Sequence, residues 1–156
     1  MGESELRAAE NEADLAEVRR LFREYQRSVG VDLCFQGFEE ELATLPGAYA
    51  PPRGRLVLAL HEGRPAGCVG LRPLGEADCE MKRLFVRPEF RGLDLGRALA
   101  EHLVGEARGL GCRRMLLDTL PSMTAAQALY RRLGFQPIAP YTRNPVPGAL
   151  FLGLEL

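Results

Sequence analysis

CEMKRLFVRPEFRGLDLGRALAEHLVGEARGL, residues 79–110, is the stretch that decides the fold. Its first part predicts a strand that ends before Pro88, because proline cannot donate to a strand ladder. Residues 89–94 predict a turn, and the helix that follows is marked by an apolar stripe at helical spacing: Leu95, Ala98, Leu99, Leu103, Ala107 and Leu110. A helix start behind a glycine-bearing turn offers unpaired N–H groups and the positive end of a dipole. This arrangement indicates a phosphate site, although many strand–turn–helix units bind nothing.

Length and charge limit the other classes of function. The 156 residues predict a single domain over 1–156, with 46% hydrophobic and 26% charged residues, as in ordinary globular chains. The net charge of −1 provides no field that would attract nucleic acid or an acidic membrane. We therefore expect neither as a partner.

The cysteines and the termini bear on the compartment. Four cysteines, at 34, 68, 79 and 112, lack the spacing of a metal site or a redox motif, so we predict reduced thiols and no metal. The N-terminus has no secretory pattern, and no apolar run is long enough to span a bilayer. These features predict a cytoplasmic protein.

The remaining pattern predicts alternating strands and helices. Strands are expected at 6–9, 56–61, 66–71, 79–86, 114–118, 135–138 and 149–156. Helices are expected at 11–28, 38–45, 95–110 and 124–133, with Asn11 and Ser122 as N-caps and Gly30 and Gly134 as stops. The order predicts a mixed α/β (α+β) fold with helices on both faces of one sheet.

Two motifs resemble those of the GNAT N-acetyltransferases. Leu84-x-Val86-x-Pro88-x-x-Arg91-Gly92-x-x-Leu95-Gly96-x-Ala98-Leu99 resembles the acetyl-CoA signature of that family. Residues 128–135, ALYRRLGF, resemble its later Leu-Tyr-x-x-x-Gly-Phe element. Both motifs occur in the family's order, so residues 6–156 are identified as similar to a GNAT domain. The resemblance implies a mixed, mostly antiparallel sheet of about seven strands.

The resemblance also implies acetyl-CoA as cosubstrate. Its binding residues would be Leu84, Phe85, Val86, Arg91, Gly92, Leu93, Asp94, Leu95, Gly96, Arg97 and Ala98. Asp94 stands where the family pattern has a glycine, and its carboxylate either points to solvent or weakens binding of the diphosphate. Met123 replaces an asparagine that the family often has, which removes one expected polar contact.

Two side chains are candidates for proton transfer. Glu80 would be the general base; the alternative is an ion pair with Lys82 or an arginine. Strand alternation places residues 80, 82, 84 and 86 on one face unless a bulge intervenes. Tyr130 would be the general acid for the departing thiolate, the alternative being a core aromatic.

These implications together describe an enzyme. It would move an acetyl group to a primary amine of a small molecule or amino acid, by direct attack in a ternary complex. The acceptor pocket would involve Phe22, Tyr25, Phe35 and residues 141–148, with Arg72, Lys82 and Arg143 as candidates to bind an acceptor carboxylate. A non-catalytic acyl-CoA sensor and a protein N-acetyltransferase are the alternatives. The sequence leaves the oligomeric state open, although a homodimer is common in the family.

Overall fold

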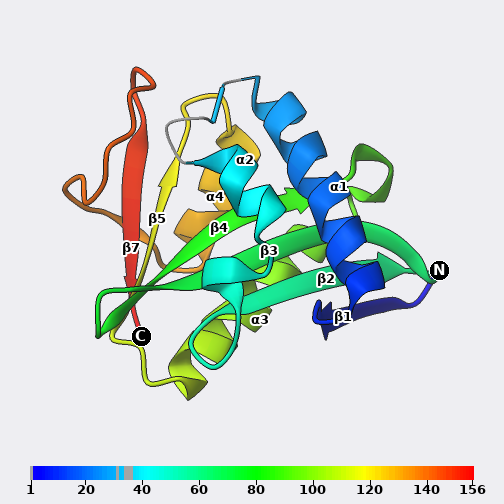
Figure 1. Cartoon of the computed structure of the whole chain (residues 1–156). Coiled ribbons are helices and arrows are strands. Elements are labelled where there is room, and N and C mark those ends of the chain that lie inside the picture. The colour runs from blue at the N-terminus through cyan, green and yellow to red at the C-terminus, as the bar shows by residue number, and fades with distance from the viewer. Residues whose placement is uncertain (1, 31, 34–36) are drawn as a thin grey trace.

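The computed structural model describes residues 2–30, 32–33 and 37–156, and its centre is one sheet of seven strands. The strands are β1 Ser4–Ala8, β2 Arg55–His61, β3 Arg64–Leu74, β4 Asp78–Val86, β5 Arg114–Thr119, β6 Gln136–Pro137 and β7 Leu150–Glu155. Their order in the sheet is β1-β2-β3-β4-β5-β7-β6, and only the β4–β5 pair is parallel (Figure 1). The predicted mixed, mostly antiparallel sheet is confirmed.

Helices cover both faces of the sheet, as predicted. They are α1 Glu12–Val29, α2 Phe38–Ala43, α3 Leu95–Gly109 and α4 Thr124–Arg132, with the short 3-10 turns η2 Gly47–Tyr49 and η3 Pro88–Phe90. In Figure 1, α1 and α2 lie in front of the sheet, and α3 and α4 lie behind it. Asn11 caps α1 by accepting from the N–H of Asp14, as expected. The predicted Ser122 cap is wrong, because Met123 occupies the N-cap of α4 without a side-chain hydrogen bond.

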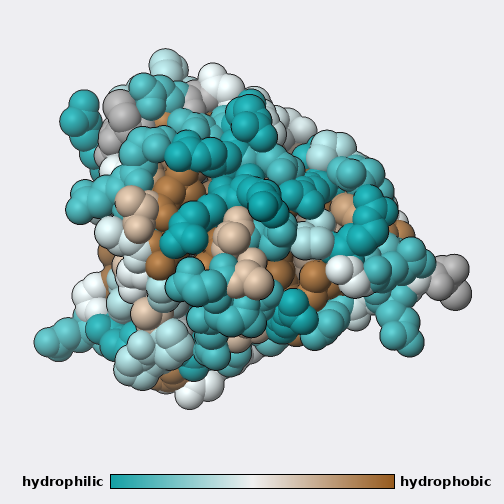
Figure 2. Space-filling view, turned by 45° about the vertical axis from the view of Figure 1, so that its right-hand side comes forward, coloured by the Kyte–Doolittle hydropathy of each residue, from teal (hydrophilic) through white to brown (hydrophobic). Residues whose placement is uncertain are grey.

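Two large hydrophobic cores follow from this layering, beside a small cluster of Ala66, Phe90 and Leu95. Val57, Leu99, Leu103 and Met115 belong to the core on the α3 side, while the core on the α1 side includes Phe22, Phe38 and Leu58. Cys68 and Cys79 are fully buried, whereas Cys34 lies outside the described residues. The face in Figure 2 is mainly hydrophilic, with apolar atoms visible in narrow areas between polar side chains. None of the helices in the described part of the chain is long and apolar enough to cross a membrane.

Strand β4 contains a bulge that changes which side chains share a face. Cys68 pairs with Phe85 and Gly70 pairs with Lys82, so β4 has one residue more than β3 across this step. Arg83 occupies the bulge with φ of 63°. Beyond the bulge the alternation reverses.

The reversal corrects the expected alternation along β4. Leu84 and Val86 pack against the α3-side core, together with Met81, whereas Phe85 belongs to the α1-side core. The shared face of residues 80, 82, 84 and 86 is predicted only for a strand without a bulge; the bulge is present, so these four residues do not share one face.

The parallel strands β4 and β5 separate at their C-terminal ends. Their pairing ends at Glu80 and Leu116, although β4 continues to Val86 and β5 to Thr119 (Figure 1). Because no neighbour pairs with this part of β4 on the β5 side, an opening forms inside the sheet. The site described next lies in this opening.

Candidate active site

The larger cavity, here called the outer groove, runs from the end of β4 between the N-terminal ends of α3 and α4. Its volume is about 550 Å³. Most of the predicted acetyl-CoA residues line it: Leu84, Phe85, Val86, Arg91, Gly92, Asp94, Leu95, Gly96 and Arg97. Leu93 and Ala98 are not part of its wall, and Leu93 projects to solvent with 46% of its surface exposed.

The first turn of α3 offers the outer groove a set of backbone donors. The first hydrogen bond into this helix runs from the N–H of Ala98 to the carbonyl of Asp94, which leaves the preceding N–H groups without a helical acceptor. Asp94 makes no side-chain cap, adopts φ of 60°, and is exposed. The helix dipole adds positive charge here, and Arg132 of α4 also lines the groove. The chemistry of this wall fits a diphosphate.

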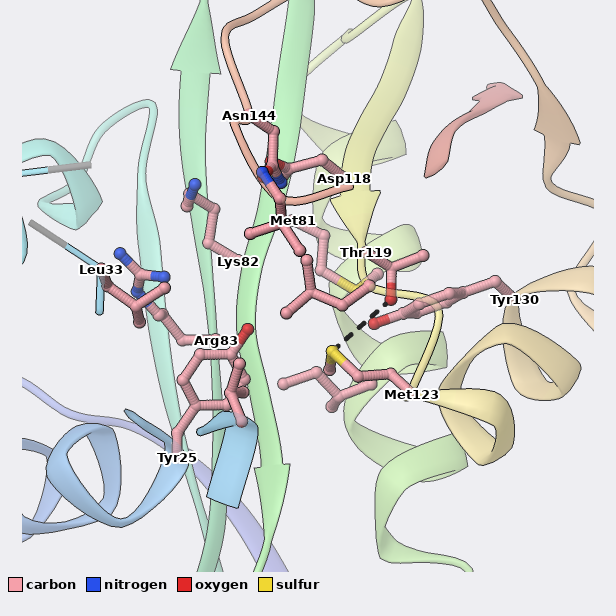
Figure 3. Close-up of a pocket in the computed structure, with 14 residues that line it drawn as sticks. Tyr25, Leu33, Met81, Lys82, Arg83, Asp118, Thr119, Met123, Tyr130 and Asn144 are labelled. Carbon is pink, nitrogen blue, oxygen red and sulfur yellow. Dashed lines mark hydrogen bonds between the residues drawn. The ribbon is translucent and has the colours of Figure 1, made fainter. Parts of the chain in front are cut away.

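A smaller cavity, here called the inner pocket, lies between the separated ends of β4 and β5. Its volume of about 30 Å³ is the space of a few water molecules. It shares Tyr25, Val29, Leu84 and Met123 with the outer groove, so the two cavities adjoin. Its polar lining consists of Tyr25, Lys82, Arg83, Asp118, Thr119, Tyr130 and Asn144 (Figure 3).

Tyr130 enters the inner pocket from α4. Its ring packs on Phe135 with centroids 5.7 Å apart, and 5% of the residue is exposed. Its hydroxyl makes no hydrogen bond to any described residue, and in Figure 3 it points toward the same part of the pocket as the hydroxyl of Thr119 and the sulfur of Met123. Burial raises the pKa of Tyr130, so the phenol stays protonated at neutral pH. Tyr130 is thus both a packed aromatic and a proton donor facing a cavity.

Glu80 has the surroundings of a buried ion pair. It is fully buried, and its Oε1 accepts from Nε of Arg72 at 2.7 Å. Its Oε2 accepts from the hydroxyl of Tyr141 at 2.6 Å and lies 3.9 Å from Nζ of Lys82. Glu80 lines neither the outer groove nor the inner pocket. The role of Glu80 as general base stays a prediction.

A carboxylate that the sequence reading missed lies on the wall of the inner pocket. Asp118 is half-buried near the end of β5 and accepts from Nδ2 of Asn144 at 3.0 Å. The sequence pattern placed it at the end of an apolar strand. An acidic residue near the C-terminal end of an apolar strand is the sequence signal that could have identified Asp118, because ligands in open sheets bind at the carboxyl ends of parallel strands.

The residues predicted to form the acceptor pocket do not all line a cavity. Tyr25 lines both cavities, and the loop between β6 and β7 contributes Asn144 and Val146. Phe22 is instead buried in the core, with its ring 6.1 Å from that of Tyr49. Phe35 lies outside the described residues.

Among the three predicted cations, Lys82 alone lines the inner pocket. Arg72 is held by Glu80, and Arg143 is exposed. Of these three candidates, only Lys82 therefore faces the inner pocket, and its role toward an acceptor's acidic group stays a prediction.

Comparison with known proteins places this geometry in a family. Residues 15–135 match the model of the acetyltransferase (GNAT) family. The chain is 41% identical over 145 residues to an uncharacterized N-acetyltransferase of Schizosaccharomyces pombe, covering 92% of this chain and 89% of that protein.

Solved structures share the fold. An acetyltransferase from Streptococcus agalactiae superposes with a TM-score of 0.82 at 22% identity, covering 98% of both chains. A GNAT family acetyltransferase from Elizabethkingia anophelis with acetyl-CoA bound has a TM-score of 0.57 at 23% identity, covering 67% of this chain and 77% of that one.

Proposed function

Because the chain belongs to the GNAT acetyltransferase family, we propose that it transfers an acetyl group from acetyl-CoA to the primary amine of a small molecule. The amine attacks the thioester directly while both substrates are bound. The observation that supports this most is the junction of the two cavities: a groove with anion-binding amides leads into a pocket lined by a phenol and a carboxylate. A sensor of acyl-CoA would need the groove, but not the polar groups beyond it.

Binding of acetyl-CoA is assigned to the outer groove. The free N–H groups at the start of α3 would hold the diphosphate, with Arg132 adding charge from α4. Gly92, at φ of 89°, allows the turn before the helix. The unpaired edge of β4 at residues 84–86 would receive the pantetheine arm, which brings the thioester toward the inner pocket.

The reaction requires two proton transfers, one to the departing sulfur and one from the attacking amine, and residues of the inner pocket would take part in them. As the amine nitrogen bonds to the acetyl carbon, the carbon–sulfur bond breaks and the electron pair stays on sulfur. We assign donation of a proton to that sulfur to the hydroxyl of Tyr130, which burial keeps protonated. The proton lost by the amine must go to a carboxylate or, through water, to solvent.

Two carboxylates are proposed to take the proton that the amine loses. Glu80, the choice from the sequence, is buried and hydrogen-bonded by Arg72 and Tyr141, so it would act through these neighbours or through water. Asp118 is favoured by its place on the wall of the inner pocket. Glu80→Gln and Asp118→Asn, compared by kcat across pH, separate them, because loss of the true acceptor lowers kcat by about 10²–10⁴-fold near neutral pH.

A thiol-release assay tests the function itself. Acetyl-CoA is incubated with the protein and with single amines, amino acids, polyamines or peptides, and free CoA thiol and the acetylated product are both measured. Release that requires one class of amine supports the proposal. Tight binding of acetyl-CoA without release for any amine would instead establish the sensor, and release with peptides alone would establish a protein N-acetyltransferase.

A further inference from the structure

Lys82 is unusual among the cations of this chain. It is the only lysine in the sequence, and all the other residues in the lysine-plus-arginine total of 20 are arginines. It precedes the bulge of β4, lines the inner pocket, and is only 7% exposed. Lysine presents a compact, strongly hydrated ammonium, which is rarely buried unless it is paired.

The ammonium of Lys82 lacks a full partner. Its nearest carboxylate oxygen is Oε2 of Glu80 at 3.9 Å, beyond hydrogen-bond distance, and that carboxylate is already held by Arg72 and Tyr141. No described residue hydrogen-bonds to Nζ of Lys82. Burial lowers the pKa of Lys82, since desolvation outweighs the attraction of Glu80 and Asp118. A buried cation in this state is stabilised by any anion that enters the pocket.

Two other charged side chains line the inner pocket, Arg83 and Asp118, and each already has a partner. Arg83 is matched by Glu41, with hydrogen bonds of 3.0 Å from both Nε and Nη2. Asp118 belongs to β5, and its carboxylate accepts a hydrogen bond from Nδ2 of Asn144. The inner pocket therefore has a cationic group from one separated strand and an anionic group from the other.

We propose that the acceptor is a small amino carboxylate, whose acidic group pairs with Lys82 and whose amine faces Asp118. The inference rests on the proposed acetyl transfer and names the substrate class of the same site. The volume of about 30 Å³ admits a carboxylate in exchange for a few waters. An amine without an acid would leave Lys82 unpaired, which makes the pocket selective.

The first experiment measures binding without turnover. Protein labelled with ¹³C-lysine gives a single lysine side-chain signal, because Lys82 is the only lysine. Its titration is followed by NMR with CoA present, after adding N-acetylated amino acids or their carboxamides. We expect the acids to raise the pKa of Lys82 and the carboxamides to leave it unchanged. Equal effects of acid and carboxamide, or none from either, overturn the proposal.

The second experiment measures selectivity. For the wild type, kcat/KM for amino acids should exceed that for their carboxamides by about tenfold or more, because truncation of a buried charge pair is costly. Lys82→Met should reduce this ratio to near one, and Lys82→Arg should keep part of it. Arg131→Gln, which removes an equal charge from an exposed position, is the matched control and should keep the full ratio.

The two proposals fail in different ways. If carboxamides or peptide amides react as well as the acids, and Lys82→Met changes nothing, the substrate class is wrong while acetyl transfer stands. If acids shift the Lys82 signal but no amine releases thiol, the pocket binds acids and the proposed enzyme activity is wrong.

Discussion

Replacing Tyr130 by Phe separates its chemical role from its packing role. The hydroxyl of Tyr130 has no hydrogen-bond partner in the described part of the chain, while the ring packs on Phe135 and within the α3-side core. Phe keeps that packing and removes no hydrogen bond. We therefore expect the free energy of unfolding to change by less than about 0.5 kcal/mol.

The effect on catalysis should be large by comparison. If the hydroxyl of Tyr130 protonates the departing sulfur, its loss lowers kcat by about 10²–10⁴-fold, which corresponds to roughly 3–5 kcal/mol of transition-state stabilisation. The KM for acetyl-CoA should stay nearly constant, because the outer groove is unchanged. Steady-state thiol release with saturating amine measures kcat, and urea denaturation measures stability.

Tyr49→Phe is the matched control. Tyr49 is 2% exposed, and its hydroxyl donates to Oε2 of Glu41 at 3.1 Å, outside both cavities. This variant should lose about 1.5–3 kcal/mol of stability, the usual worth of a hydrogen bond to a charged group, and keep its kcat. A Tyr130→Phe enzyme with kcat within threefold of wild type would refute the proton-donor role and leave a core aromatic.

Three further predictions concern neighbouring positions. Asp94→Gly should tighten acetyl-CoA binding several-fold by calorimetry, because it removes an exposed carboxylate beside the diphosphate site; unchanged or weaker binding contradicts this. Gly67→Ala should lower the free energy of unfolding, measured by urea denaturation, by about 1–3 kcal/mol, because the new Cβ would lie 2.6 Å from the Phe85 carbonyl oxygen. Wild-type stability of this variant would show that the backbone of β4 shifts to make room. Lys82→Met should raise stability at pH 7 by about 1–3 kcal/mol, because it removes a buried cation without a hydrogen bond. The pKa of Lys82 is lowered in the folded protein, so between that pKa and 10.5 the unfolded wild type binds more protons than the folded one. The wild type therefore becomes more stable as pH rises through this window, and the stability advantage of Lys82→Met should shrink. An advantage that is constant between pH 7 and 11 contradicts the reasoning.

The bulge at Arg83 is a feature that the local sequence pattern does not predict. Strand alternation along β4 predicted one face for Glu80 and Val86, but one extra residue relative to β3 reverses it. The bulged conformation is accompanied by contacts that are remote in sequence: the guanidinium of Arg83 pairs with Glu41, and its charge lies 5.1 Å from the ring centre of Phe38. No window of neighbouring residues contains these partners.

The two candidate carboxylates show the same limit. Glu80 was a reasonable choice from its place on the strand, but its hydrogen bond to Tyr141 joins residues 61 positions apart. Asp118 is brought to the wall of the inner pocket by the separation of β4 from β5. That separation depends on how seven strands pair, which is a property of the whole sheet.

The sequence alone determined the strand, the turn and the helix over residues 79–110, the Asn11 cap and the turn that borders the outer groove. These features depend on side-chain periodicity, proline and glycine conformations, and unpaired amides within a few residues, all of which are local. Only the tertiary structure decided that Lys82 is buried without a hydrogen bond, facing the pocket that also holds Asp118 and Tyr130. Burial and electrostatic environment arise when separate segments exclude water together, so they exist only in the folded chain.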